Sequence, residues 1–512
     1  MTTRNRSRAA IVAAMGAAVA LAAFAVGGAQ GRAIGAYTTK GTWSFRSAPA
    51  LHPPKVRADT PTITRRLAPG YFLAATTYGV GGPQLMTGQG GPLILDSRLR
   101  PVWVKPIGTK ALAFNLQEQR YHGRPVLTWW QGVVTRVGVP VRGEDIVVDD
   151  HYREIGKPLR GADGWVISVH DFVISGHNAW VTAYKSVSGV DLSPYGGPQS
   201  GSVLDSAVQE YDLTSGRLLY TWDLLNPGGK PNVPLSDSKQ PLPADGVTAW
   251  DAYHLNSIQV LASGRVLVSA RNTWSAYLLE VPSGNIVWTL SGDPKLSSFS
   301  LPPNARFHWQ HSVLLQRGNV ISIYDDACCG LANGKVGPAS GPSRGLLLKL
   351  DLANRTGLLR AQYTRGRHFD TYFLGSMQPL AGGNALVGWG SLPFFSEFSR
   401  SGRVLLDARW PAPDISYRVF LEPWAGTPSS PPSGAVRRAH GRTTVYASWN
   451  GATKVAAWRV LAGASTGHLN PAVARVPKAG FETEVPLTAS YKVFRVQALD
   501  RGGRVLGTSR PF

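Results

Sequence analysis

Three histidines occupy comparable places in segments that lie far apart in the chain. His170 lies in "VISVHDFVISG", His254 in "DAYHLNSIQV" and His311 in "FHWQHSVLLQ". Each comes just before or at the start of an apolar segment that a turn follows. An imidazole can act as a nucleophile, as an acid or base, or as a metal ligand. A single histidine here is more simply read as a cap or a partner for a buried backbone group, but three at comparable positions indicate a shared site.

The stretch from residue 251 to 274, "DAYHLNSIQVLASGRVLVSARNTW", adds two polar candidates to His254. Asn256 follows His254 by two residues, so both side chains are expected on the same face of a strand. Arg271 ends the next strand. A zinc site of three histidines is the alternative, since imidazole is a common zinc ligand. Arg271 favours a bound oxyanion over a second cation, because a guanidinium supplies charge and paired donors.

Other residues near these positions are expected to have structural roles. Trp274 and Trp309 could flank an aryl ring, but packing is the preferred interpretation of both. Asp325 and Asp326 are expected in turn or capping roles. His308 has the opposite strand parity to His311, so it is left out of the site.

The elements that must position these residues repeat along the chain. Apolar strands, glycine turns and a strand that ends in an aromatic residue recur at 40 to 65 residues, most clearly in "NSIQVLASGRVLVSARNTWSAYLLEVPSGNIVWTL". In that copy Gly264 and Gly284 mark turns and Trp288 lies in the last strand. About six such repeats of four strands predict an all-β, six-bladed β-propeller, whose inner strands would bring distant residues to one channel. A sandwich of irregular strands is the alternative, but it does not explain the repetition.

The rest of the chain divides into attachments to this domain. We predict a propeller over 69–424, a linker over 425–435 and, over 436–512, an accessory domain resembling a fibronectin type III or immunoglobulin-like sandwich. Residues 36–68 are Pro-rich and are expected to lie extended on a surface, without regular structure of their own. Residues 1–35 join three arginines to an apolar run, which is typical of a secretory signal. An uncleaved membrane anchor is the alternative, and either predicts an extracytoplasmic protein.

The net charge and the two cysteines also bear on the classes of function that the sequence favours. The formal net charge is +22, yet Arg and Lys are dispersed singly, which favours a generally positive surface over a nucleic-acid interface. The chain has 2 cysteines, Cys328 and Cys329. Adjacent cysteines could form a strained vicinal disulfide, which would stabilise little by loop closure, so the pair is read as local turn chemistry.

Four short segments carry a family resemblance: "YHLNS", "VSARNTW", "FHWQHSV" and "GNALVGWG". Together they resemble the bacterial arylsulfotransferases that do not use a nucleotide sulfate donor, a family with a six-bladed propeller. The resemblance spans roughly residues 35–420 and is most specific from Asp251 to Asp326. It is closest to the actinobacterial branch of the family.

The resemblance implies roles for the candidate residues. The family's order of a His, a His-x-Asn, an Arg seventeen residues after the second His, and a nucleophilic His is similar to the order found here. It implies that His311 accepts a sulfuryl group, that His254, Asn256 and Arg271 bind its oxygens, and that His170 assists binding or proton transfer.

Sulfuryl transfer through a sulfohistidine gives ping-pong kinetics and needs no metal or organic cofactor. The expected partners are a small-molecule phenolic sulfate donor and a phenolic acceptor, with no nucleic acid.

Two other functions are alternatives to sulfuryl transfer. A non-catalytic propeller that binds an anionic or sulfated ligand is the main alternative. A quinone-dependent dehydrogenase is disfavoured, because no clustered carboxylate here suits its metal.

Overall fold

The computed structural model describes most of the chain beyond its first forty residues. The described residues are 41–59, 66–78, 86–108, 110–135, 139–328, 331–332, 335–336, 341–366 and 369–512. The expected signal or anchor segment, 1–35, lies outside them. Within them the regular structure is β-strand with short 3-10 turns, which confirms the all-β class. No helix in this part of the chain is long and apolar enough to cross a bilayer.

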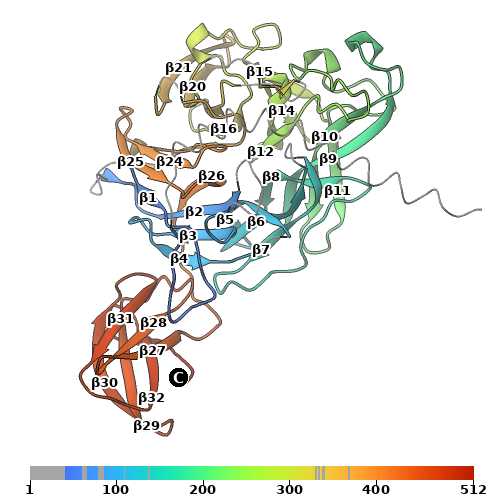
Figure 1. The fold of residues 1–512 in the computed structure, drawn as a ribbon. Helices are drawn as coiled ribbons and strands as arrows, with labels where there is room; N and C mark the ends of the chain where they lie inside the picture. Colours follow the sequence, from blue (N-terminus) through green and yellow to red (C-terminus); the bar gives the residue numbers. More distant parts are fainter. Residues whose placement is uncertain are drawn as a thin grey trace, which may run out of the picture.

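Six antiparallel sheets follow one another through the larger part of the molecule (Figure 1). Their strands, in order from the first strand outward, are as follows. The first is β26 (Asp414–Glu422), β2 (Tyr71–Tyr78), β3 (Gly91–Leu95) and β4 (Pro101–Val104); the second is β5 (Leu112–Tyr121), β6 (Arg124–Val134) and β7 (Pro140–Val148); the third is β8 (Val166–Ser175), β9 (Asn178–Val190), β10 (Gly201–Asp212) and β11 (Leu218–Asp223).

The remaining three sheets continue the series. The fourth is β12 (Leu255–Leu261), β13 (Arg265–Ala270), β14 (Ser275–Glu280) and β15 (Ile286–Ser291); the fifth is β16 (His311–Gln316), β17 (Val320–Asp325), β20 (Arg344–Asp351) and β21 (Thr356–Tyr363); the sixth is β22 (Ser376–Pro379), β23 (Ala385–Gly388), β24 (Phe394–Phe398), β25 (Val404–Arg409) and β1 (Arg57–Ala58). A small hairpin, β18 (Leu331–Ala332) with β19 (Lys335–Val336), and short 3-10 turns complete this part. The turns are η3 (Ser193–Tyr195), η4 (Leu235–Asp237), η5 (Arg271–Thr273), η6 (Pro303–Ala305) and η7 (Ala381–Gly383).

The first strands of the six sheets contact one another in a closed ring. β5 contacts β8, β8 contacts β12, β12 contacts β16, β16 contacts β22, β22 contacts β26, and β26 returns to β5. The ring is closed by pairing strand β26 from late in the chain with β2 from its beginning. Hydrophobic clusters fill the spaces between neighbouring sheets; one of them joins Leu267 and Leu290 of the fourth sheet to Ile321 and Leu346 of the fifth. The sheets therefore face each other around a common centre.

The first strands are irregular where they approach that centre. The pairing register shifts between Phe114 and Gln117 in β5, between Ile167 and Phe172 in β8, between Leu255 and Ser257 in β12, between His311 and Leu314 in β16, and opposite Tyr417 and Arg418 in β26. A β-bulge leaves residues unpaired and re-aims their side chains. All the histidines of interest lie in or beside these shifts.

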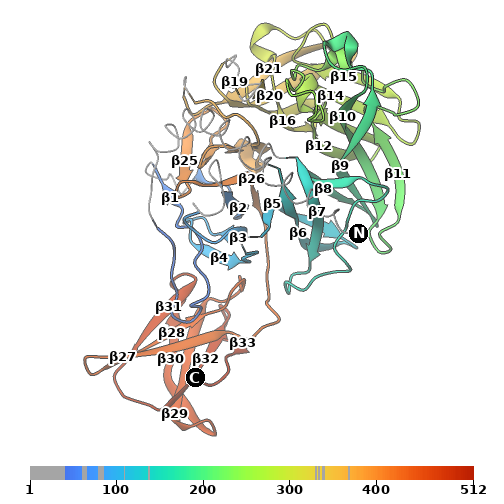
Figure 2. The same cartoon turned by 45° about the vertical axis from the view of Figure 1, so that its right-hand side comes forward.

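Two further sheets form the C-terminal part, lower in Figures 1 and 2. The first comprises β27 (Ser433–Ala439), β28 (Arg442–Ser448) and β31 (Glu482–Leu487); the second comprises β30 (His468–Pro477), β29 (Ala457–Ser465), β32 (Val493–Leu499) and β33 (Val505–Thr508). Both sheets contribute to one hydrophobic cluster that includes Val445, Trp458 and Val496. β27 begins at Ser433, inside the segment expected to be a linker.

The segment before β2 connects the two parts of the molecule. Ser47 donates hydrogen bonds from its backbone and its hydroxyl to Glu482 (both 2.6 Å), and the Phe45 ring lies 4.3 Å from that of Phe481. Further along, β1 pairs with β25. The expectation that this Pro-rich segment has no regular structure was therefore wrong for β1, because Arg57 and Ala58 extend an open sheet edge.

Candidate functional site

Three histidines from three different sheets meet at the centre of the ring. The ring centroids of His170 and His254 are 4.9 Å apart, and those of His170 and His311 are 6.3 Å apart. The Tyr417 ring stands edge-on to His170 and His311, at 5.6 and 6.0 Å. The structure therefore brings together the three imidazoles that the sequence singled out.

His311 begins β16 and both of its ring nitrogens have partners. Nδ1 lies 2.6 Å from Oδ2 of Asp326, and the backbone N–H of Leu374 donates to Nε2 at 3.3 Å. The side chain is 1% exposed. Burial lowers the pKa of His311 well below its ordinary value, and the charge of Arg271 lowers it further. His311 is therefore a neutral imidazole at neutral pH.

Asp326 directly follows β17 and its side chain is completely buried. The hydroxyl of Thr371 donates to Oδ1 at 2.9 Å, and that of Ser343 donates to the Asp326 backbone carbonyl at 2.6 Å. Burial raises the pKa of Asp326, while the charge of Arg271 and the Thr371 hydroxyl offset part of the increase.

The expectation of a turn or capping role was wrong for Asp326, because its carboxylate turns inward to His311. The same expectation fits Asp325, which accepts from the backbone N–H groups of His308 and Ala327 and pairs with Arg344 at 2.9 Å.

His254 precedes β12 in a left-handed backbone conformation, with φ of 57°. Its Nδ1 lies 2.6 Å from Oδ2 of Asp251, and its side chain is 12% exposed, whereas that of His311 is 1% exposed. A non-glycine residue with positive φ is uncommon and often marks a functional position. His254 is thus held by a carboxylate in the same way as His311, at a more accessible place.

His170 lies in the irregular part of β8 and is fully enclosed. Its Nδ1 contacts the hydroxyls of Ser168 and, at 3.3 Å, Tyr184. Burial lowers the pKa of His170 well below its ordinary value, and the charges of His254, Arg418 and Arg271 act in the same direction. His170 is therefore held neutral by its surroundings, with hydroxyl partners in place of a carboxylate.

Arg271 starts the 3-10 turn η5 and is 8% exposed. Its Nη1 donates to Oδ1 of Asn272 at 3.0 Å and its Nη2 to the carbonyl of Tyr372 at 2.9 Å. Its Nε is buried and has no hydrogen-bond partner among the described residues. The positive charge of the guanidinium lowers the pKa of His311.

The tryptophans near Arg271 pack on charged and aromatic neighbours. Arg271 lies over the Trp309 ring at 4.8 Å, and Trp309 meets Trp274 edge-on at 5.5 Å. Trp274 also meets His308 edge-on at 4.5 Å. These contacts agree with the packing roles expected of both tryptophans, and they place His308 beside Trp274.

Asn256 is fully buried and lies at a shift in strand pairing. Its amide nitrogen donates to the carbonyl of Gln310 at 2.7 Å, and its Oδ1 has no partner among the described residues. His254 lies outside β12 and the register shifts at Asn256, so regular strand alternation does not apply to this pair. The bond to Gln310 instead ties the His254 segment to the residue before His311.

A second buried arginine, which sequence reasoning missed, lies beneath the histidines. Arg418 in β26 pairs with Asp171 at 2.6 Å and donates to the backbone carbonyl of Asn256 at 3.0 Å. Its Nη1 also reaches Oδ1 of Asn115 at 3.3 Å. Asp171 raises the pKa of Arg418 despite its burial. The available signal was an arginine inside "ISYRVF", a segment of a largely buried strand.

Among the described side chains, no group of three or more His, Cys, Asp or Glu is arranged to hold a metal ion. Cys328 takes part in a disulfide, and Cys329, the chain's other cysteine, lies outside the described residues.

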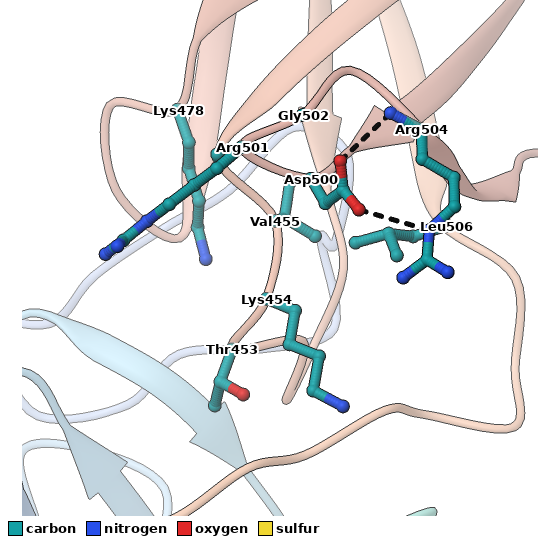
Figure 3. A pocket seen from close by; sticks show the side chains of 10 residues that line it. Thr453, Lys454, Val455, Lys478, Asp500, Arg501, Gly502, Arg504 and Leu506 are labelled. Carbon is teal, nitrogen blue, oxygen red and sulfur yellow. Dashed lines mark hydrogen bonds and ion pairs between the residues drawn. The ribbon is translucent and has the colours of Figure 1, made fainter.

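A pocket of about 590 Å³ lies in the C-terminal part, away from the histidines (Figure 3). Its lining carries four basic side chains and one acidic one, in the set Thr453, Lys454, Val455, Ala456, Lys478, Asp500, Arg501, Gly502, Arg504 and Leu506. Figure 3 shows two hydrogen bonds from Arg504 to the Asp500 carboxylate. The backbone N–H of Arg504 donates at 2.9 Å and its Nε donates at 3.1 Å.

Comparison with known proteins gives one informative match. The model of the family described as Arylsulfotransferase (ASST) matches residues 117–410, which contain all five predicted site residues. No curated protein matches the chain.

The similar solved structures are remote. They include a protein of unknown function from Bacteroides caccae, with 11% identity over 69% of this chain and 98% of that one, at a TM-score of 0.38. Virginiamycin B lyase from Staphylococcus aureus has 10% identity over 69% of this chain and 87% of that one, at a TM-score of 0.26. An exo-β-1,3-galactanase from Phanerochaete chrysosporium has 10% identity over 86% of this chain and 99% of that one, at a TM-score of 0.31. Likenesses of this kind bear on neither substrate nor chemistry.

Proposed function

The chain belongs to the arylsulfotransferase (ASST) family, and from this premise we propose that it moves a sulfuryl group from a phenolic sulfate ester to a phenolic acceptor. The transfer proceeds through a sulfohistidine on His311 with ping-pong kinetics and without a metal or organic cofactor. One observation carries the proposal: His311 is a buried, neutral imidazole whose Nδ1 is bound to a carboxylate, and the charge of the buried Arg271 acts on it.

The first half of the reaction uses the Nε2 lone pair of His311, which must first leave its hydrogen bond with the Leu374 backbone N–H. Nε2 forms a bond to sulfur while the bond from sulfur to the phenolic oxygen breaks, and that bonding pair leaves with the phenolate. Negative charge is spread over the three sulfuryl oxygens, so catalysis depends on positioning and on fixed donors. In the second half the oxygen of an acceptor phenol attacks sulfur, its proton passes to a base, and the N–S pair returns to Nε2.

The residues around His311 suit the roles that the family resemblance implies. Arg271 supplies a buried positive charge, and its two described side-chain bonds use two of its five N–H groups. His254 is the most accessible of the three histidines and has Asp251 to hold a proton on its ring. Asn256 has a second amide hydrogen beyond the one that bonds to Gln310, and this hydrogen is proposed to bind a sulfuryl oxygen. His170 is proposed to assist binding or proton transfer.

We propose the following architecture for this function. The six sheets form the blades of a β-propeller that β26 closes by pairing with β2, and the two C-terminal sheets form an immunoglobulin or fibronectin III-like sandwich. The proposed domain limits are those expected from the sequence, except that the C-terminal domain includes β27, which begins at Ser433. The protein is proposed to act outside the cytoplasm.

Turnover of 4-nitrophenyl sulfate with a phenol acceptor tests the proposal. The wild type should release nitrophenol and form the sulfated acceptor, whereas His311→Ala should lose at least about 1,000-fold of the rate, as expected when a nucleophile is removed. His308→Ala is the matched control, because His308 contacts Trp274 outside the histidine cluster. It should keep most of the wild-type rate.

Binding without turnover is the second candidate function, and the basic C-terminal pocket is the observation that favours it. In that case the folded protein would bind aryl sulfates or other anions in equilibrium dialysis while releasing no nitrophenol. Equal nitrophenol release from wild type and His311→Ala would likewise count against transfer through His311.

A further inference from the structure

We propose that Asp326 is a positioning residue that fixes the proton of His311 on Nδ1, both before sulfuryl transfer and while the ring carries the sulfuryl group. The second part of this inference rests on the proposed function. The first part concerns the resting protein alone.

One ring nitrogen of His311 faces a hydrogen-bond donor, and the other faces a carboxylate acceptor. The Leu374 backbone N–H points at Nε2 and can only donate, so Nε2 must present its lone pair. A neutral imidazole has one N–H, and this must then be on Nδ1, directed at the Asp326 carboxylate 2.6 Å away. Two independent contacts therefore assign the same tautomer.

The donor at Nε2 is itself held in an unusual backbone conformation. Leu374 has φ of 68°, in the left-handed region that large side chains rarely adopt. The next residue is glycine, with φ of 112°, and a Cβ on Gly375 would lie 2.2 Å from the Tyr324 ring. This turn keeps the Leu374 N–H aimed at His311.

Asp326 is fixed as firmly as the ring it faces. Thr371 donates to its second carboxylate oxygen, and the Tyr324 hydroxyl lies 2.8 Å from that of Thr371. Ser343 bonds both to Thr371 and to the Asp326 backbone. All four residues are completely buried. The carboxylate therefore cannot turn away from His311 without breaking this network.

The fixed proton has a chemical consequence for the intermediate. When Nε2 bonds to sulfur, the ring still carries the Nδ1 proton and becomes a positively charged sulfo-imidazolium. If that proton left, the ring would be uncharged while the sulfo group kept its negative charge, and the leaving group would be an imidazolide anion, a far poorer one. Asp326 retains the proton and balances the positive charge, so the second half-reaction expels neutral imidazole and no proton is consumed at Nδ1.

Asp326→Asn tests this assignment. The asparagine can keep the Thr371 bond through its oxygen and present an N–H to His311, which disfavours a proton on Nδ1 and opposes the preference set by the Leu374 N–H. Nitrogen-15 NMR spectra of histidine-labelled protein without substrate should show the Nδ1–H tautomer of His311 in the wild type and its loss in Asp326→Asn. The signal is assigned by its absence in His311→Gln. Asp251→Asn is the matched control; it removes the equivalent partner of His254 and should leave the His311 signal unchanged.

Single-turnover kinetics supply the second readout. Asp326→Asn should slow both half-reactions by about 100-fold or more, since a wrong tautomer at a histidine held by a carboxylate has effects of this order or larger. If Asp326→Asn fails to fold, Thr371→Val replaces it; this variant loosens the carboxylate and should give a mixture of His311 tautomers.

The outcomes separate the two proposals. A wild-type His311 with its proton on Nε2, or an Asp326→Asn rate within threefold of wild type, would overturn the role of Asp326. A wild type that shows the Nδ1–H tautomer, lost in Asp326→Asn, but never forms a sulfuryl adduct would leave the positioning role standing while the proposed transfer fails.

Discussion

At the scale of single residues, the central feature is a set of neutral imidazoles next to buried positive charge. Burial is the largest cause of the lowered pKa of His170 and of His311, and the charges of Arg271 and Arg418 add to it. A protonated His311 would have no lone pair at Nε2 and could not attack sulfur. Arg271, which is proposed to bind a sulfuryl group, therefore also helps to keep the nucleophile unprotonated.

This arrangement sets the acid limit of the first half-reaction. Because the pKa of His311 is lowered, the neutral form persists as the pH falls through 6.5, the ordinary value for histidine. We expect the single-turnover rate of nitrophenol release to be level from pH 8 to below pH 6.5 and to fall only at lower pH. A rate that falls to half near pH 6.5 would contradict the lowered pKa.

The types of the site residues were predictable from the sequence, but their contacts were not. The recurrence of histidine at the start of apolar segments was enough to predict that His170, His254 and His311 lie together. Asp326 was misjudged because adjacent carboxylates after a strand usually serve the turn, as Asp325 does here. Which of the two faces inward depends on Thr371 and Ser343, residues distant in sequence.

At the scale of elements, the register shifts of the first strands decide what reaches the centre. The prediction that Asn256 and His254 share a strand face assumed regular alternation, and the pairing register shifts at Asn256. Repeating strands and glycine turns predicted the sheets well, with Gly264, Gly284 and Trp288 in the expected places. Irregular pairing leaves no such pattern in a sequence, which is why the site departs from prediction where the strands bulge.

Arg418 shows how one strand can hold several of these elements together. It extends from the closing strand β26 to Asp171 in β8 and to the backbone of Asn256 in β12. Arg418→Met should lower the free energy of unfolding by about 3 to 5 kcal/mol, because it leaves a buried carboxylate without its partner. Denaturant unfolding would measure this loss.

The exposed pair of Arg504 and Asp500 gives the matched control for Arg418→Met. Its arginine side chain is 78% exposed, against 4% for Arg418, so Arg504→Met should change stability by no more than about 1 kcal/mol. The double variant Arg418→Met with Asp171→Asn should recover part of the loss. Equal effects of Arg418→Met and Arg504→Met would show that the buried pair does not hold the ring closed.

At the scale of the whole molecule, the C-terminal part is docked on the first sheet. The side chain of Asn450 both accepts from the backbone N–H of Val104 and donates to its carbonyl, each at 2.9 Å. The hydroxyl of Tyr152 donates to the Gly451 carbonyl at 2.7 Å, and the N–H of Gly451 donates to Val102 at 2.8 Å. The sequence predicted two units here, but not how they pack, because these bonds involve backbone groups that no composition reveals.

Asn450→Ala should loosen this junction. It removes both hydrogen bonds to Val104 and leaves two backbone groups unpaired, at a cost of about 1 to 3 kcal/mol for each buried group. We expect faster cleavage by a protease between Trp424 and Ser433, followed by mass spectrometry of the fragments. Asn470→Ala, at an exposed position in β30, is the control and should be cleaved as slowly as the wild type.

The most direct test of the account is peptide mass spectrometry after brief incubation with 4-nitrophenyl sulfate and no acceptor. We expect a sulfuryl group on the peptide that bears His311, its loss when a phenol is added, and its absence in His311→Ala. Folded protein that carries no adduct on this peptide, while still releasing nitrophenol or binding aryl sulfates, would contradict transfer through His311.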